Sequence, residues 1–118
     1  MGDGEKCIHL FERDCSFQRN FQKIIEITPA PKLKQSTKNL IYQYGTRICE
    51  EVSLKGLATV EFLVSKGQKI FFIEVNPRIQ VEHTITEELT RVDLVRAQIN
   101  IFSGLKLKAV SYTHLRAH

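Results

Sequence analysis

The sequence predicts an α+β fold, mainly an antiparallel sheet with flanking helices. Two β-rich runs, LATVEFLV at 57–64 and KIFFIEVN at 69–76, flank the turn-forming residues SKGQ, a pattern typical of a hairpin. Residues 32–52 form the clearest helix, because apolar side chains recur there at helical spacing: Leu40, Ile41, Tyr44 and Ile48.

The N-terminal part is expected to hold a turn and two strands. Asp3-Gly4 is a strong turn signal, and the apolar residues of CIHLF at 7–11 predict the second strand of a hairpin. The first strand of that hairpin is missing from the sequence, so the chain is expected to start in the middle of a fold. A polar connector follows, with a short strand at 24–27 that Pro29 and Pro31 end.

The helix at 32–52 follows these two prolines. Ser36 or Thr37 can cap its start. Gly45 lies inside it and lowers its intrinsic stability.

Two shorter helices are predicted near the C-terminus. The pattern Thr84-x-x-Glu87 is a capping box that opens the first. Asp93 can cap the second, at 94–103, with Gly104 at its end. We expect this last helix to be buried because it is apolar on most sides.

The composition is that of a soluble globular domain or a piece of one. The chain has 118 residues, of which 42% are apolar and 25% charged, and no apolar run is long enough to span a membrane. A net charge of +4 favours an anionic partner, but the sequence has no basic stripe and no nucleic-acid motif, so no nucleic-acid partner is expected. Three cysteines fit no zinc spacing and predict reduced thiols. The tail at 110–118 lacks periodicity and is expected to be foreign to the fold.

The predicted hairpin places two carboxylates opposite each other. With Gly67-Gln68 as a two-residue type II′ turn, counting outward pairs Glu61 with Glu74. Opposed Cβ atoms lie about 4.5–5.5 Å apart. Two carboxylates at that distance on an apolar face repel each other, unless one takes up a proton or a cation lies between them. Alternation puts five side chains on this face: Glu61, Leu63, Phe72, Glu74 and Asn76.

These oxygen donors indicate a metal site. Carboxylate and amide oxygens without His or Cys suit Mg²⁺ or Mn²⁺ rather than zinc. Mg²⁺ keeps positions open for phosphate oxygens, so a nucleotide is the natural co-ligand. Glu61, Glu74 and Asn76 are therefore candidate metal ligands, and surrounding apolar residues indicate burial on both faces. The alternatives are a solvated sheet edge with two exposed glutamates, or a turn shifted by one residue, which would undo the pairing.

Polar side chains continue beyond Pro77. Alternation would put Arg78, Gln80 and Glu82 on one side, with a fork-shaped cation for a planar oxyanion and a carboxylate that accepts a proton. A cation and a base beside a metal–nucleotide site predict a small carboxyl-type substrate. These groups would bind it, deprotonate it and direct it at a phosphorus atom of the nucleotide. The alternative is a surface loop with an Arg–Glu salt bridge. His83, beside a helix start, is interpreted as structural.

These residues lie in stretches that resemble a known family. The biotin carboxylase component of biotin-dependent carboxylases resembles this chain in three stretches, HLFERDCSFQRNFQK, TVEFLV and FFIEVNPRIQVEHTITEEL. Within that family, the stretches are most similar to the sequences of pyruvate carboxylases. The resemblance runs from about residue 3 to about residue 107. An E-x-N-x-R after a strand occurs in several ATP-grasp ligases, but its continuation into Q-V-E-H is characteristic of the carboxylase branch.

The resemblance implies a fold and a reaction. Residues 1–109 would be the C-terminal part of a biotin carboxylase ATP-grasp domain, truncated at both ends. The family uses MgATP and bicarbonate to carboxylate biotin carried on a partner domain, through carboxyphosphate and CO₂. The sequence has no glycine-rich phosphate loop and no biotinylation motif, so the fragment alone is expected to be inactive. Because the first strand of its first hairpin is expected to be missing, it is also expected to be marginally stable.

The resemblance also implies ligands for the nucleotide. Glu61, Glu74 and Asn76 would bind Mg²⁺ or Mn²⁺ beside ATP. Gln18 would lie near the nucleotide sugar, and Lys23 would reach phosphate or bicarbonate oxygens.

A second group would bind bicarbonate and biotin. Arg78 would hold bicarbonate and stabilise the biotin enolate. Gln80 and the backbone N–H of Val81 would complete the bicarbonate site, and Glu82 would be the general base.

One departure from the family concerns the nucleotide. Phe21 stands where relatives usually have His in a Q-R-R-H-Q-K run, and Asn20 replaces the second Arg. The change at Phe21 would remove a hydrogen bond to the ribose and weaken nucleotide binding.

The implied setting is a pyruvate carboxylase-like enzyme in the cytoplasm, or in the mitochondrial matrix of a eukaryote. Its expected partners are ATP, bicarbonate, a biotinylated carrier domain, a carboxyltransferase domain and further copies of itself in a homo-oligomer, with no nucleic acid and no membrane. Two alternatives remain. One is the biotin carboxylase subunit of an acetyl-CoA or propionyl-CoA carboxylase, and the other is a non-catalytic remnant, which Phe21 favours.

Overall fold

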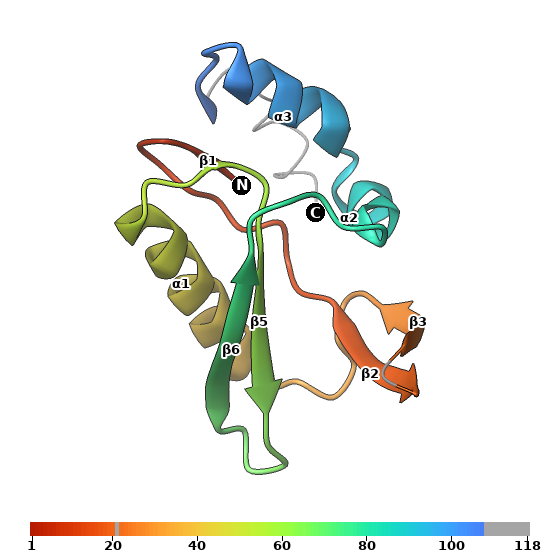
Figure 1. The fold of residues 1–118 in the computed structure, drawn as a ribbon. Coiled ribbons are helices and arrows are strands. Elements are labelled where there is room, and N and C mark those ends of the chain that lie inside the picture. Colours follow the sequence, from red (N-terminus) through yellow and green to blue (C-terminus); the bar gives the residue numbers. More distant parts are fainter. Residues whose placement is uncertain (21, 108–118) are drawn as a thin grey trace.

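The computed structural model describes residues 1–20 and 22–107, which contain three helices and six strands (Figure 1). The α+β prediction is confirmed. In chain order the elements are β1 Gly2–Asp3, β2 Asp14–Arg19, β3 Gln22–Ile27, α1 Gln35–Glu51, β4 Lys55–Gly56, β5 Thr59–Val64, β6 Ile70–Asn76, α2 His83–Thr90 and α3 Leu94–Phe102. None of the helices in this described part is long and apolar enough to cross a membrane.

The strands pair only in antiparallel fashion, as predicted, but not as one sheet. In the described residues they form three two-stranded sheets, β1–β4, β2–β3 and β5–β6. The predicted strand at 24–27 is confirmed within β3, whereas β2 was expected to be part of a polar connector. The sequence of β2 shows no apolar pattern, because a two-stranded sheet buries little of either face and tolerates polar side chains on both.

The chain begins with a small hairpin, and the expectation that its first strand is missing is wrong. Met1 and Ile8 exchange backbone hydrogen bonds of 2.9 Å in both directions. The Asp3 backbone N–H donates to Lys6 at 3.0 Å, so the turn lies at Gly4 and Glu5. The predicted second strand is reduced to a single bridge, between Gly2 and Cys7.

Helix α1 confirms the helix predicted at 32–52, but neither predicted cap is used. It begins after Lys34, whose side chain makes no capping hydrogen bond. The Thr37 hydroxyl instead donates to Gln68 Oε1 at 2.7 Å, and the Lys34 N–H donates to the same oxygen at 3.3 Å. These two bonds tie the loop between β5 and β6 to the start of α1.

Helix α2 is confirmed, but its predicted capping box is wrong. The helix begins at His83, one residue before Thr84, and Glu82 precedes it without a side-chain cap. Glu87 serves a different backbone group, because its Oε2 accepts the Leu94 N–H at 2.8 Å. That bond links α2 to the start of α3.

Helix α3 confirms the predicted cap, since Asp93 Oδ1 accepts the Arg96 N–H at 2.9 Å. Gly104 follows the helix with a φ of +98°, as a C-terminal glycine does. The expectation of burial on most sides is wrong. Ala97 and Ile101 are buried, whereas Ile99 is 59% exposed and Phe102 57% exposed.

The core lies between α3 and the N-terminal hairpin. Seven buried apolar residues form it, namely Met1, Leu57, Val92, Leu94, Ala97, Ile101 and Leu107. Ile79 packs against this core from the segment that follows β6, and so anchors that segment. Gly56 has a φ of +104°, and a Cβ there would lie 2.9 Å from the Phe102 ring, so only glycine lets β4 approach α3 this closely.

Asp3 joins the two ends of the described chain. Its Oδ1 accepts the N–H groups of Glu5 at 2.9 Å and Lys6 at 2.8 Å, and its Oδ2 accepts the Leu107 N–H at 3.1 Å. These backbone hydrogen bonds lower the pKa of Asp3 to about 2. The charged carboxylate therefore stabilises the fold above the pKa of an unfolded aspartate, and this contribution disappears as the pH falls towards 2.

We predict that Asp3→Asn lowers the free energy of unfolding at pH 7 by about 1–3 kcal/mol, because an amide cannot accept all three bonds. The difference from the parent chain should shrink as the pH falls from 4 towards 2, since the parent loses its charged carboxylate there. Urea unfolding at several pH values measures this. Glu5→Gln is the matched control, because the Glu5–Lys106 ion pair is exposed and contributes little. A difference that does not change with pH would contradict the assignment.

Candidate functional site

Strands β5 and β6 pair Glu61 with Glu74, as the sequence predicts, but the predicted turn is wrong. Ser65 and Lys69 close the loop, with the Ser65 N–H donating to Lys69 at 2.9 Å, so the loop has three residues, Lys66 to Gln68. The pairing first runs one residue out of the predicted register, with Phe62 opposite Phe72. A bulge between Phe62 and Glu61 then adds one residue, Ile73, to β6 and restores the predicted pair.

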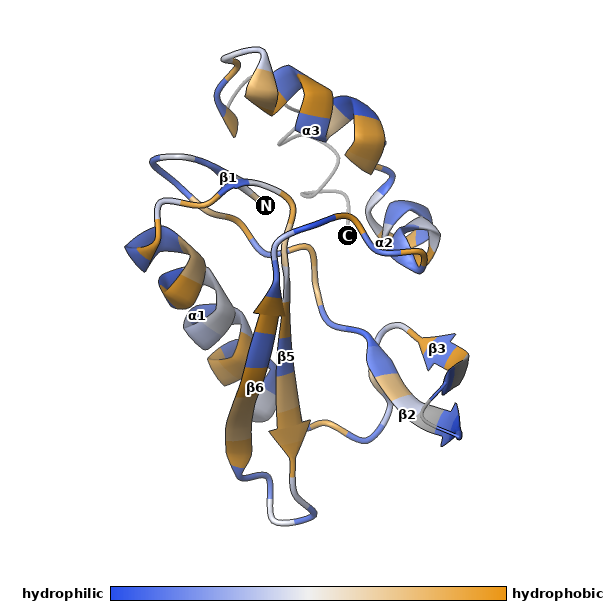
Figure 2. Ribbon diagram, viewed as in Figure 1, coloured by the Kyte–Doolittle hydropathy of each residue, from blue (hydrophilic) through white to orange (hydrophobic). Residues whose placement is uncertain are grey.

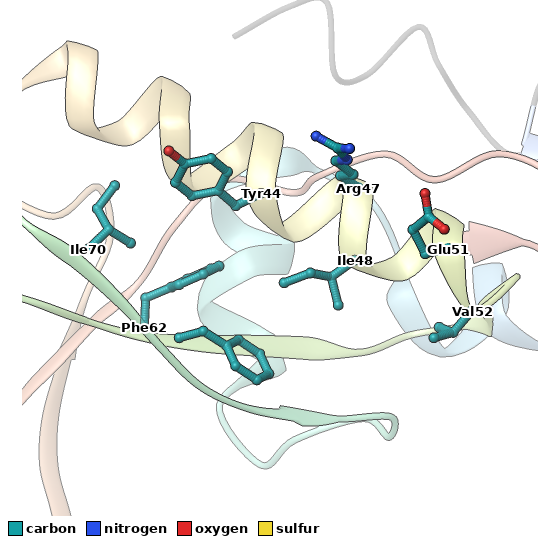
Figure 3. Close-up of a pocket in the computed structure, with 8 residues that line it drawn as sticks. Tyr44, Arg47, Ile48, Glu51, Val52, Phe62 and Ile70 are labelled. Atoms are coloured by element: carbon teal, nitrogen blue, oxygen red, sulfur yellow. The ribbon is translucent and has the colours of Figure 1, made fainter.

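The bulge changes which side chains share a face. Phe72 was expected on the same face as Glu61, but it pairs with Phe62, at a distance of 6.2 Å between ring centroids. Both rings line a groove of about 450 Å³ against α1, together with Ile48 and Tyr44 (Figure 3). The expected membership of Phe72 in the carboxylate face is therefore wrong.

Asn76 brings the two carboxylates together. Its Nδ2 donates to Glu61 Oε1 and to Glu74 Oε1, at 3.3 Å in each case. Glu61 and Asn76 are half-buried, and Glu74 is exposed. The side chains of the three predicted metal ligands thus converge on one point of the hairpin.

This trio fits a hard divalent cation. Glu61 and Glu74 supply carboxylate oxygens, and a rotation of the Asn76 amide would replace its NH₂ by Oδ1 as a third oxygen donor. The described residues contain no group of three or more His, Cys, Asp or Glu side chains arranged for a metal. Two carboxylates and an amide leave most positions of an octahedral ion open, which suits an ion that is shared with phosphate oxygens.

The surroundings of the trio are more open than the sequence suggests. Leu63 is 60% exposed and Phe71 52% exposed, so the expectation of burial on both faces is wrong. Figure 2 shows hydrophobic residues along most of β5 and β6, interrupted by a hydrophilic band. The hairpin therefore presents an apolar surface beside its carboxylates in the described part of the chain.

The segment after β6 does not continue as a strand. The ladder of β5 and β6 ends at Asn76, and the chain then turns. The alternation that would place Arg78, Gln80 and Glu82 on one side therefore does not hold. Arg78 is exposed, and its Nη1 donates to the Ile79 carbonyl at 3.3 Å. Gln80 is only 5% exposed, whereas the neighbouring Val81 is 87% exposed.

His83 holds this turn. Its backbone N–H donates to the Gln80 carbonyl at 3.1 Å, and its Nδ1 lies 2.8 Å from the same oxygen. Its Nε2 lies 3.4 Å from Glu87 Oε1. With both ring nitrogens engaged within the fold, the contacts of His83 agree with its structural interpretation.

The predicted nucleotide residues lie on a different sheet. Gln18 pairs with Lys23 across β2 and β3, and the exposed Gln18 side chain donates to the Cys15 carbonyl at 3.0 Å. In the part of the chain that the structure describes, no hydrogen bond joins Gln18 to Glu61, Glu74 or Asn76. Phe21, the Lys23 side chain and the tail at 110–118 lie outside the described residues.

Sequence reasoning missed Arg13. Its Nη1 donates to Thr86 Oγ1 at 3.1 Å, its Nη2 donates to Gln80 Oε1, and its Nε lies 3.5 Å from Glu26 Oε1. No local pattern predicts these contacts, because Arg13 and Gln80 are 67 positions apart. A lone arginine before a strand is read as solvated until a structure shows its partners.

Comparison with known proteins gives a consistent result. Residues 1–110 match the family described as carbamoyl-phosphate synthase L chain, ATP binding domain. The pyruvate carboxylase of Aspergillus niger is 45% identical over 117 residues, which cover 98% of this chain and 10% of that protein. The chain thus spans about a tenth of the length of that relative.

Solved structures share the fold. The biotin carboxylase domain of a single-chain bacterial carboxylase superposes with a TM-score of 0.91 at 46% identity, covering 93% of this chain and 26% of that one. A single-chain, multi-domain long-chain acyl-CoA carboxylase gives a TM-score of 0.85 at 49% identity, covering 88% and 11%.

We predict that Glu74→Gln abolishes the rise in melting temperature that Mn²⁺ causes in the parent chain. Saturating Mn²⁺ should raise the melting temperature of the parent, because the ion offsets the repulsion between Glu61 and Glu74. Without metal, Glu74→Gln should be more stable than the parent by about 0.2–1 kcal/mol at low salt, since like charges directly opposite destabilise a sheet.

Thermal unfolding with and without Mn²⁺ tests both parts. Glu88→Gln is the matched control, because Glu88 is an exposed acid on α2 that pairs with Arg91 at the surface. Equal responses to Mn²⁺ in the two variants would count against the metal site.

Proposed function

Because the chain belongs to the family of carbamoyl-phosphate synthase L chain ATP-binding domains, we propose that residues 1–109 form the C-terminal part of the ATP-grasp domain of a biotin carboxylase. The observation that carries this proposal is the convergence of Glu61, Glu74 and Asn76. Holding two acidic groups opposite each other costs free energy, and the binding of a cation with a nucleoside triphosphate would offset that cost. The 46% identity to a biotin carboxylase domain supports the choice of reaction.

The proposed reaction is the MgATP-dependent carboxylation of biotin by bicarbonate. A bicarbonate oxygen attacks the γ-phosphorus of ATP, which releases ADP and gives carboxyphosphate. Carboxyphosphate would then break into CO₂ and phosphate, the phosphate would take the ureido proton of biotin, and that nitrogen would form the new bond to CO₂. Bound Mg²⁺ or Mn²⁺ would neutralise charge on the phosphates.

The residues of this chain would bind and orient the substrates. Glu61, Glu74 and Asn76 would hold the ion, and Lys23 would contact phosphate or bicarbonate oxygens. Arg78 is exposed and can turn its guanidinium towards an anion, which it would hold by two hydrogen bonds.

The turn before α2 would complete the anion site. The 87% exposure of Val81 suits a segment that presents a backbone N–H to a ligand. Gln80 would donate beside it, and the half-buried Glu82 would take the proton from bicarbonate.

The proposed partners follow from the reaction. Biotin would arrive on a carrier domain, and a carboxyltransferase domain would use the product within a homo-oligomeric enzyme. A location in the cytoplasm or the mitochondrial matrix suits the thiols of Cys7 and Cys49, whose pKa values are raised by burial so that they stay protonated.

A second candidate is a biotin carboxylase that serves an acyl-CoA. The likeness to a long-chain acyl-CoA carboxylase, at 49% identity, favours it as much as the likeness to the Aspergillus niger pyruvate carboxylase favours the first. The residues described above act on biotin before the acceptor is involved, so the two candidates share one site.

We predict that Glu61→Ala and Glu74→Ala each lower ATP cleavage by at least about 100-fold, because each removes a metal ligand. The assay uses a hybrid carboxylase, in which residues 1–107 replace the matching segment of a bacterial biotin carboxylase. Bicarbonate-dependent release of phosphate from ATP is the measurement.

The control for this experiment is Glu51→Ala, an exposed acid that lines the groove on the α1 side of the hairpin. Its activity should stay within about twofold of the parent hybrid. Normal rates in both carboxylate variants would end the metal assignment, and an inactive parent hybrid would contradict the proposed function.

A further inference from the structure

Arg13 connects three parts of the fold through one guanidinium group. Its side chain is 14% exposed, and it contacts Glu26 on β3, Gln80 in the turn before α2, and Thr86 on α2. The Glu26 side chain is 4% exposed, so the Arg13–Glu26 pair is largely shielded from water. Buried charge pairs of this kind keep their geometry because breaking them leaves an uncompensated charge.

The backbone that leads to Arg13 is also fixed. The adjacent Glu12 accepts hydrogen bonds from Tyr42 Oη on α1 and from the Ala30 N–H at 3.0 Å, and it pairs with Lys38 Nζ at 2.9 Å. Burial would raise the pKa of Glu12, but the bonds from Tyr42 and Lys38 outweigh it and lower this pKa. Glu12 therefore stays charged near neutral pH and anchors Arg13 to α1.

Arginine decides how the Gln80 amide is turned. A guanidinium group has only donors, so the acceptor Oε1 of Gln80 must face it. The reversed amide would set the Gln80 NH₂ against the N–H groups of Arg13, with no acceptor between them. Planarity of the amide then directs the Gln80 Nε2 donor away from Arg13.

The outward donor is available to a ligand. Within the described residues, no hydrogen bond from Gln80 Nε2 is found, although Gln80 is only 5% exposed. Its carbonyl is held by His83, and its neighbour Ile79 packs on the core, so the turn is fixed on both sides. Gln80 Nε2 is not a buried donor that lacks an acceptor, so its N–H reaches the surface of the turn, where an oxyanion can accept it.

We propose that Arg13 is a positioning residue that presents the Gln80 amide N–H to bicarbonate. This inference rests on the proposed function, because bicarbonate is its ligand. Arg13 does not touch the anion itself. It acts by excluding the amide orientation that would turn Gln80 Oε1, an acceptor, towards a negatively charged substrate.

The test compares Arg13→Met/Glu26→Gln with Glu26→Gln in the hybrid carboxylase. The second substitution removes the buried charge that Met would leave unpaired, and Glu26→Gln alone keeps the Arg13–Gln80 bond. The KM for bicarbonate should rise about tenfold in the double variant relative to Glu26→Gln, as for the loss of one hydrogen bond. The KM for ATP should stay within about twofold, because Arg13 acts on Gln80 and not on the phosphates.

Two further variants separate positioning from folding. Thr86→Val removes another partner of Arg13 and leaves Gln80 in place, so its bicarbonate KM should match the parent. Arg13→Lys keeps the charge but cannot hold Gln80 and Glu26 together, so its bicarbonate KM should rise by about threefold. This variant decides the question if the double variant does not fold.

An unchanged bicarbonate KM, or equal rises in the KM for bicarbonate and ATP, would overturn the role of Arg13 while the proposed function stands. A parent hybrid without bicarbonate-dependent ATP cleavage would overturn the proposed function and this inference with it.

Discussion

The antiparallel pairing of Glu61 with Glu74 is the constraint on which the candidate site depends. The ladder fixes the two backbones, so neither carboxylate can move far from the other, and Asn76 reaches both from the end of the same strand. Repulsion between the carboxylates is offset in part by the amide donor and would be offset fully by a divalent cation. Because β6 ends at Asn76, the turn that carries Arg78 and Gln80 starts from this fixed point.

Local patterns predicted the elements well and their ends poorly. Helix α1, the hairpin of β5 and β6, and the Asp93 cap of α3 follow from spacing and residue type within a few positions. The cap at Thr37 fails because its hydroxyl donates to Gln68, and Ser36 lies inside α1 and not before it. The capping box at Thr84 fails because Glu87 accepts the Leu94 N–H instead. The exposed apolar side of α3 could not be foreseen, because periodicity shows which residues are apolar and not which surfaces meet them.

The Glu61–Glu74 pair of the candidate site was predicted correctly, although the turn from which it was counted was wrong. Counting from a two-residue turn gives the correct Glu61–Glu74 pair only because the longer loop and the bulge at Ile73 cancel. The contact between Arg13 and Gln80 had no sequence signal, since it joins residues that only the tertiary fold brings together. The role of Lys23 came from the family resemblance, and that of Glu82 from the residue pattern as well as the resemblance; both stay predictions.

The bulge at Ile73 also decides which losses of a residue the carboxylate pair would survive. Phe62 lies opposite Phe72 and Glu61 opposite Glu74, so a β6 strand without Ile73 would keep both pairs, now on straight strands. Loss of Val75 would instead put Asn76 directly after Glu74, with its side chain on the other face of the sheet. Deletions in this part of the gene are therefore expected to survive selection at position 73 and to be lost at position 75.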